Sequence, residues 1–124
     1  MNLLPELKNR ARARPQRIVL PEGEDERVVQ AAAQIAQEGF AKAILLGKPS
    51  ALQAAAAATG HSLKGVEIIE PAGCHNLDNY VRLYYDRRKS KGITADEARQ
   101  TSLQPLYFAD LMVAAGDADG SVAG

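Results

Sequence analysis

The chain has 124 residues, 46% of them hydrophobic and 24% charged, which is ordinary for a globular domain and suggests one domain. Its 15 lysines and arginines balance 15 aspartates and glutamates, so no overall field argues for a nucleic acid or an anionic membrane as partner. The single cysteine, Cys74, excludes an internal disulfide, and no apolar run approaches the roughly 20 residues that span a bilayer. We expect a cytoplasmic protein.

The first segment, residues 1–16, is a basic leader, and residues 17–124 form a partial α/β domain in our division of the chain. Residues 1–17 carry four arginines but only a two-leucine apolar patch, so they lack the apolar core of a signal peptide. We interpret the leader as a solvated basic arm, with a nucleic-acid arm as the alternative.

The first strand and helix are predicted next. A β-branched run, residues 17–20, is closed by Pro21 and predicts a strand. Apolar residues at three- and four-residue spacing then continue to Gln37 and predict an amphipathic helix. Carboxylates at residues 24–26 suit the positive end of the helix dipole, and Gly39 suits the helix C-terminus.

A second helix is predicted from the alanine-rich residues 54–58, and Gly60 ends it. Its start is open, because Ser50 and Gln53 have the spacing of a capping box, whereas Pro49 also suits the first helical position.

Two further strands, residues 42–46 and 66–70, flank this helix. Alternating strands and helices with short connections predict a parallel sheet with helices packed on its faces. The predicted fold class is therefore α/β, a three-layer α/β/α arrangement with a mostly parallel sheet.

Three helices follow without a strand between them. Asn76 is the expected cap of the first, which ends in the basic residues 87–91, and Thr94 with Glu97 has the spacing of a capping box for the second. Pro105 suits the first turn of the third. Together they could form one side of a cleft.

The last stretch is almost continuously apolar over residues 106–115, with Asp110 as its one charge, and predicts a buried helix. Residues 117–120 predict a sharp turn that carries two carboxylates, and residues 121–123 predict the start of a strand. Since no polar tail follows, we expect this chain to be a piece of a longer protein.

The strongest charged feature is the basic end of the long helix, with four cations in residues 87–91. The helix dipole alone stabilises cations there, which is the alternative to a binding role. Their density exceeds what capping needs, and guanidinium groups match phosphate oxygens in a bidentate way. We predict a phosphate-binding role.

A metal site has little support. Asp117 and Asp119 could suggest calcium, but no residue after Gly120 supplies the distal glutamate of a calcium loop. One cysteine and two separated histidines do not make a zinc site, and no glycine-rich nucleotide motif follows the first strand. We expect no metal and no cofactor.

Four stretches in this order resemble the N-terminal part of the phosphate acetyl/butyryltransferase family: RIVLPEGEDERV, AKAILLG, YYDRRKSKGIT and PLYFADLMVAAGDADGSVAG. The resemblance runs from about residue 17 to residue 124. It implies a cytoplasmic homodimer that reversibly transfers an acetyl group between coenzyme A and inorganic phosphate, in a cleft between two α/β domains and without a metal.

The resemblance also implies a mechanism in which a carboxylate takes the proton of the coenzyme A thiol, and the thiolate attacks acetyl phosphate. A serine and arginines hold the phosphate and the developing oxyanion. By the same resemblance these groups lie downstream of Gly124, so we expect no catalytic residue in this chain and no activity of the chain alone.

The resemblance implies substrate contacts along one wall of the cleft. Arg88 is the best candidate for the phosphates of coenzyme A. The full set of candidate substrate-binding residues is Arg87, Arg88, Lys91, Asp117, Asp119 and Ser121.

Three other functions are weighed. The same family domain senses acyl-CoA when it is fused behind malic enzymes, but Met1 and the short leader argue against such a fusion. A phosphate butyryltransferase has the same pattern. A flavodoxin-like signalling domain is the third, although Pro21 and Glu22 match its acidic strand end poorly.

Overall fold

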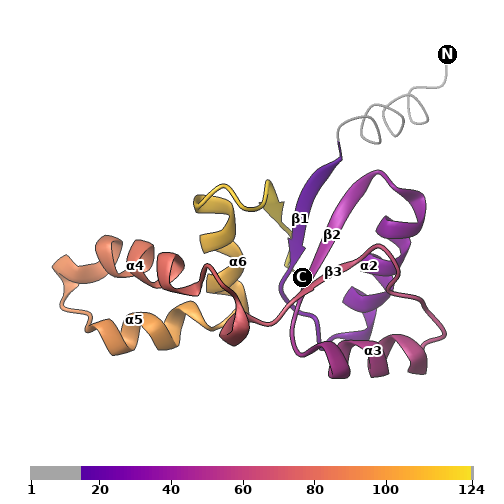
Figure 1. Ribbon diagram of the computed structural model, residues 1–124, viewed down its shortest axis with the longest axis horizontal. Coiled ribbons are helices and arrows are strands. Elements are labelled where there is room, and N and C mark those ends of the chain that lie inside the picture. The colour runs from indigo at the N-terminus through magenta and orange to yellow at the C-terminus, as the bar shows by residue number, and fades with distance from the viewer. Residues whose placement is uncertain (1–14, 124) are drawn as a thin grey trace, which may run out of the picture.

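The computed structural model describes residues 15–123, in which four parallel strands form one sheet in the order β3-β2-β1-β4 (Figure 1). The strands are β1 (Gln16–Leu20), β2 (Ala41–Leu46), β3 (Glu67–Ile69) and β4 (Gly120–Ser121). The helices are α2 (Glu26–Glu38), α3 (Pro49–Ala58), α4 (Leu77–Arg88), α5 (Ala95–Ser102) and α6 (Pro105–Ala114), with short 3-10 turns η1 (Pro71–Gly73) and η2 (Lys89–Lys91).

The sheet is parallel throughout its described strands, as the helical crossovers require. Val19 on β1 lies beside Ile44 on β2, and Leu45 on β2 lies beside Ile68 on β3. On its other side, Val19 pairs with Ser121 of β4. The prediction of a parallel α/β sheet is therefore confirmed.

The two faces of the sheet carry separate apolar clusters, because side chains alternate along a strand. Val19 and Ile44 point to the face that α4 and α6 cover, where Tyr80 and Phe108 are fully buried. Leu20 and Leu45 point to the opposite face, which α2 and α3 cover. Figure 1 shows the two sets of helices on either side of the strands. The predicted three-layer arrangement is confirmed.

Helix ends follow the sequence signals at some positions. The carboxylate of Asp25 accepts the backbone N–H of Arg27 at 2.9 Å and caps α2, which Gly39 ends with a φ of 73°. Thr94 accepts the N–H of Glu97 at 3.1 Å and caps α5, as its spacing predicts.

At the start of α3 the structure decides between two predictions, and at the start of α4 it differs from the prediction. α3 begins at Pro49, so Ser50 is already inside the helix and makes no cap. Asn76 occupies the cap position of α4 with a ψ of 5° rather than the extended backbone typical of a cap, and makes no capping bond. Its side-chain amide donates to the carboxylate of Asp117.

The apolar run of α6 predicts a buried helix that is partly uncovered in this chain, and the helix is buried on one side only. Phe108 and Met112 pack into the sheet cluster, whereas Leu106 is 53% exposed and Tyr107 is 41% exposed.

Of the basic leader, residues 1–14 lie outside the described residues, and Gln16 is already part of β1. None of the helices within residues 15–123 combines the length and the apolar character that crossing a bilayer requires.

Candidate functional site

The basic end of α4 lies at the outer end of a helix that reaches away from the sheet alongside α5 (Figure 1). α4 ends at Arg88, η2 continues to Lys91, and Gly92 then turns the chain with a φ of 85°. The side chains of Arg87, Arg88 and Lys91 are exposed here. The structure thus brings these three predicted residues together on one protruding surface.

Aromatic side chains of α4 and of the neighbouring helix α6 support this surface. The guanidinium carbon of Arg88 lies 6.0 Å from the centre of the Tyr84 ring, which is within the range of a cation–π contact. The ring of Tyr84 meets that of Tyr107, on α6, at 5.8 Å and 79°. A cavity of about 180 Å³ opens between the two helices, lined by Tyr84, Arg87, Arg88, Tyr107, Asp110 and Leu111.

The charge of this surface is only partly balanced. Lys89 pairs with Asp86 at 3.6 Å, but no carboxylate among residues 15–123 forms an ion pair with Arg87, Arg88 or Lys91. Guanidinium groups without a carboxylate partner keep their N–H donors available for phosphate oxygens. This arrangement can bind a phosphorylated ligand.

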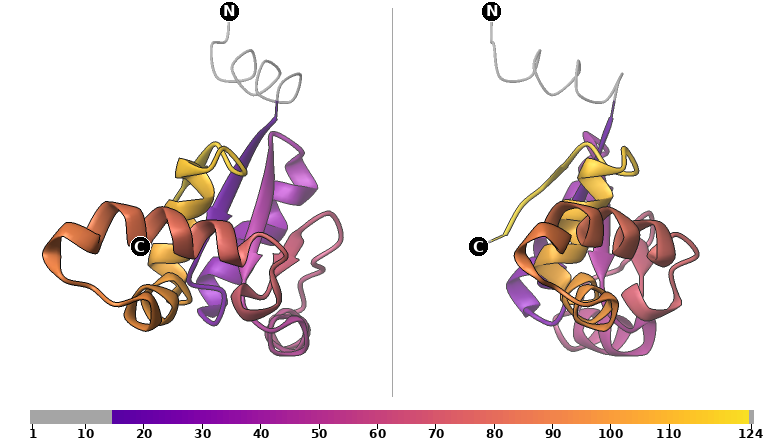
Figure 2. Two further views of the ribbon diagram at one scale, coloured as in Figure 1. Left: turned by 60° about the vertical axis from the view of Figure 1, so that its left-hand side comes forward. Right: turned by 90° about the vertical axis from the view of Figure 1, so that its left-hand side faces the viewer.

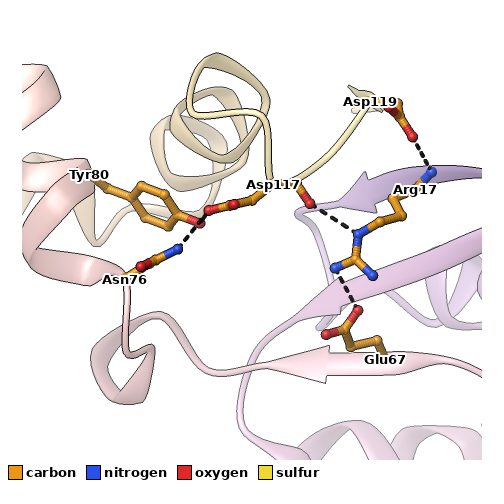
Figure 3. A network of polar contacts seen from close by, with 6 residues as sticks. All are labelled: Arg17, Glu67, Asn76, Tyr80, Asp117 and Asp119. Carbon is orange, nitrogen blue, oxygen red and sulfur yellow. Dashed lines mark hydrogen bonds and ion pairs between the residues drawn. The ribbon is translucent and has the colours of Figure 1, made fainter.

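The predicted aspartates form a different group, which ties the turn before β4 to β1 and α4 (Figure 3). The carboxylate of Asp117 accepts the amide of Asn76 at 2.9 Å and the hydroxyl of Tyr80. Arg17 donates through Nε to the carbonyl of Asp117 at 3.0 Å, and its backbone N–H donates to the carboxylate of Asp119 at 2.7 Å.

Arg17 links this turn to the far strand as well, since its guanidinium pairs with Glu67 of β3 at 2.9 Å. Both side chains of that pair are more than a third exposed, so the ion pair itself contributes little. The interpretation of Asp117 and Asp119 as turn-forming residues matches these contacts, which hold the turn in place.

Tyr80 is the buried member of the group, with 2% of its surface exposed. Burial, together with the adjacent carboxylate of Asp117, raises the pKa of the Tyr80 hydroxyl above its ordinary value. The hydroxyl is a neutral donor at physiological pH, and the raised pKa keeps it one at more alkaline pH.

The two groups of candidates lie apart. Tyr80, beside Asp117, and Arg88 are separated by about 12 Å along the axis of α4. The turn with Asp117 and Asp119 precedes β4 and so lies at the amino end of the sheet, where ligands of open α/β sheets rarely bind. Ser121 is exposed on β4 itself.

A third feature, which the sequence did not lead us to predict, lies at the carboxyl ends of β1 and β2. A cavity of about 500 Å³ lies there, lined by Pro21, Glu22, Gly23, Glu24, Asp25, Leu46, Gly47, Gln104, Pro105 and Leu106. The position of this cavity could have been predicted, because residues that follow neighbouring parallel strands meet at the carboxyl edge of the sheet. Arg27, through its hydrogen bonds, lowers the pKa of the Asp25 carboxyl at the margin of this cavity.

No group of three or more histidine, cysteine or acidic side chains within residues 15–123 is placed to hold a metal. Cys74 is half-buried beside the sheet cluster. His61 contacts the hydroxyl of Thr59 at 3.1 Å, in the segment that leads from α3 to β3.

Comparison with known proteins gives consistent results. The model of the family described as "Phosphate acetyl/butaryl transferase" matches residues 2–124. The phosphate acetyltransferase of Acetivibrio thermocellus is 40% identical over 124 residues, which are all of this chain and 37% of that protein. That of Nitratidesulfovibrio vulgaris is 39% identical over 118 residues, 95% of this chain and 17% of that protein.

Solved structures agree with the sequence matches. The EutD phosphotransacetylase from Staphylococcus aureus superposes with a TM-score of 0.88 at 35% identity, over 98% of this chain and 37% of that one. A phosphotransacetylase from Streptococcus pyogenes superposes with a TM-score of 0.83 at 31% identity, over 100% of this chain and 38% of that one. The chain therefore spans well under half the length of these relatives.

Proposed function

Because the chain belongs to the phosphate acetyl/butyryl transferase family, we propose that it takes part in the reversible transfer of an acetyl group between coenzyme A and inorganic phosphate. In this reaction acetyl-CoA and phosphate give acetyl phosphate and coenzyme A. The chain spans about a third of the length of several relatives, so the activity is proposed for the protein to which this chain contributes one surface.

One observation carries the proposal: at the cationic end of α4, Arg87, Arg88 and Lys91 have no carboxylate partner among the described residues, on a fold shared with phosphotransacetylases. Coenzyme A bears a diphosphate and a ribose phosphate, so its nucleotide end is strongly anionic. Arg88 is the proposed phosphate ligand, with Arg87 and Lys91 beside it, because guanidinium groups bind phosphate oxygens in pairs.

The remaining predicted residues, Asp117, Asp119 and Ser121, lie at the turn before β4 and on β4. Asp119 and Ser121 are exposed and remain proposed cleft-lining residues. The carboxylate of Asp117 already accepts two side-chain hydrogen bonds, so its proposed role is to support the turn that presents Asp119 and Ser121.

The chemistry proposed for the whole protein needs no cofactor and no metal. The thiol of coenzyme A gives its proton to a carboxylate, the sulfur bonds to the acetyl carbon, and the bond to the phosphate oxygen breaks as phosphate leaves. Positioned donors stabilise the oxyanion that forms on the carbonyl. We assign none of these reacting roles to residues 15–123.

The proposed setting is a cytoplasmic homodimer. The exposed apolar side chains Leu106, Tyr107 and Val122 support association, since large exposed apolar side chains favour contacts between chains.

The test is calorimetric titration of coenzyme A into chain 1–124 and two matched variants. Arg88→Ala should weaken binding about ten- to a hundredfold, because a charge-assisted hydrogen bond is worth about 1.5–3 kcal/mol. Lys89→Ala removes an adjacent cation that Asp86 already balances, and should weaken binding much less. Equal affinities for the unmodified chain and Arg88→Ala would return residues 87–91 to helix capping alone.

A further inference from the structure

Arg88 is held by an aromatic face rather than by a carboxylate. Its guanidinium carbon lies 6.0 Å from the centre of the Tyr84 ring, one helical turn earlier on α4. Residues four apart on a helix are neighbours on its surface, so this contact is built into the helix itself. No carboxylate among residues 15–123 pairs with Arg88, although Asp110 lines the same cavity.

Tyr84 is itself held in place by the side chains that it packs against. It is half-buried and packs against the cluster that α4 and α6 form on the sheet. Its ring meets that of Tyr107 nearly at a right angle, at a centroid distance of 5.8 Å, which is a preferred geometry for two aromatic rings. Both views of Figure 2 show α4 lying close to α6, the helix that carries Tyr107.

The neighbour of Arg88, a carboxylate or an aromatic ring, decides whether the N–H groups of its guanidinium are available to a ligand. A carboxylate that is hydrogen-bonded to the guanidinium would occupy the N–H groups that a phosphate needs. An aromatic face attracts the same positive charge electrostatically and leaves the N–H groups at the guanidinium edge uncommitted.

We propose that Tyr84, supported by Tyr107, is a positioning residue that holds the Arg88 guanidinium ready for a phosphate group of the substrate. The inference rests on the proposed function, because it deepens the role of Arg88 as the phosphate ligand. It adds specificity for a phosphorylated ligand by limiting the rotamers of an otherwise exposed arginine.

The experiment is a double-mutant cycle on chain 1–124, with coenzyme A as the probe and calorimetry as the readout. Tyr84→Leu should weaken binding about two- to fivefold, the range of an exposed cation–π contact. Tyr84→Phe keeps the aromatic face and should bind as the unmodified chain does. Tyr85→Leu is the matched control, since Tyr85 is also half-buried on α4 and makes no aromatic contact within residues 15–123.

The cycle separates positioning from packing. If Tyr84 acts through Arg88, then Tyr84→Leu should cost nothing further in the Arg88→Ala background. A second readout is the NMR signal of the Arg88 Nε–H group, which the Tyr84 ring should shift in the unmodified chain and in Tyr84→Phe, but not in Tyr84→Leu.

The outcomes distinguish the two proposals. Loss of binding in Arg88→Ala with full binding in Tyr84→Leu would overturn the positioning role and leave the proposed function standing. A penalty for Tyr84→Leu that persists in the Arg88→Ala background would also overturn it. If Arg88→Ala binds coenzyme A as tightly as the unmodified chain, the proposed phosphate contact fails, and the inference fails with it.

Discussion

Asp117 shows how much structure one carboxylate can organise. It accepts hydrogen bonds from Asn76 and Tyr80 at the start of α4, while its backbone carbonyl accepts one from Arg17 on β1. Without this acceptor the buried hydroxyl of Tyr80 would lose its partner, at a cost of about 1–3 kcal/mol. The turn before β4 therefore depends on contacts with residues about forty and a hundred positions away in the chain.

Tyr80 gives this group a measurable pH dependence. Burial and the Asp117 carboxylate raise the pKa of Tyr80 in the folded chain above the ordinary value of 10.0. Above about pH 10 the unfolded chain releases this proton while the folded chain keeps it, so the free energy of unfolding should fall as pH rises through that range. Below pH 10 the contribution is fully present.

The measurement is urea unfolding of the unmodified chain and of Tyr80→Phe between pH 7 and pH 11. The variant should be less stable by about 1 kcal/mol at pH 7, because it lacks one hydrogen bond, and the difference should shrink above pH 10. A constant difference across the whole range would contradict the raised pKa.

At the scale of elements, the loop from β1 to α2 packs directly on the end of β2. A Cβ atom added at Gly23 would lie 2.2 Å from the carbonyl oxygen of Leu46, closer than real Cβ contacts allow. Backbone on that side cannot move aside as a flexible side chain can. The glycine therefore lets two strand ends meet at the edge of the 500 Å³ cavity.

Gly23→Ala should destabilise the chain by about 1–3 kcal/mol, the range for overpacking. Gly73→Ala is the matched control, since an added Cβ there meets nothing within 4 Å and its φ is not positive. Denaturant midpoints of the two variants decide the matter. Equal stability of both would show that the loop moves away from β2 at little cost.

Helix boundaries show where local sequence signals suffice. Thr94 and Ser50 each stand three residues before a Glu or Gln, yet only Thr94 caps a helix. Pro49 settles the other case, because its ring fixes a helical φ and its missing N–H needs no acceptor at the first position. Asn76 occupies the position where a cap is expected, but its side-chain amide donates a hydrogen bond to Asp117, which is distant in the sequence.

At the scale of the whole molecule, the parallel direction of the strands and the layers could be predicted because they follow from alternation along the chain. The distances between the candidate site residues could not be predicted in this way. The basic run and the Asp117 turn lie within about thirty residues of each other in the sequence. In the structure Tyr80, which contacts Asp117, and Arg88 are about 12 Å apart along the axis of α4. The contact of Tyr84 with Tyr107 likewise depends on how α4 meets α6, and no local pattern encodes it.

This separation bears on catalysis by the chain itself. Acyl transfer needs both substrates at near-attack distance between opposed groups. Residues 15–123 present one cationic surface and no catalytic group that we can assign beside it. Purified chain 1–124 should therefore bind coenzyme A without transferring acetyl groups.

The assay follows phosphate-dependent release of coenzyme A from acetyl-CoA, with a reaction lacking phosphate as its control. Turnover near the median of enzymes, about 10 per second, would mean that the catalytic groups lie within this chain after all.

The most direct test of the central claim is to map where coenzyme A binds by amide NMR chemical shifts of the isotope-labelled chain 1–124. The proposed contact lies at the end of α4, so saturable shifts should concentrate at residues 84–91 and around Tyr107. Salt should weaken them, because the contact is to phosphate. Shifts concentrated instead at the carboxyl-edge cavity around Glu22 and Gly47, or at the Asp117 turn, with residues 84–91 unchanged, would contradict the account.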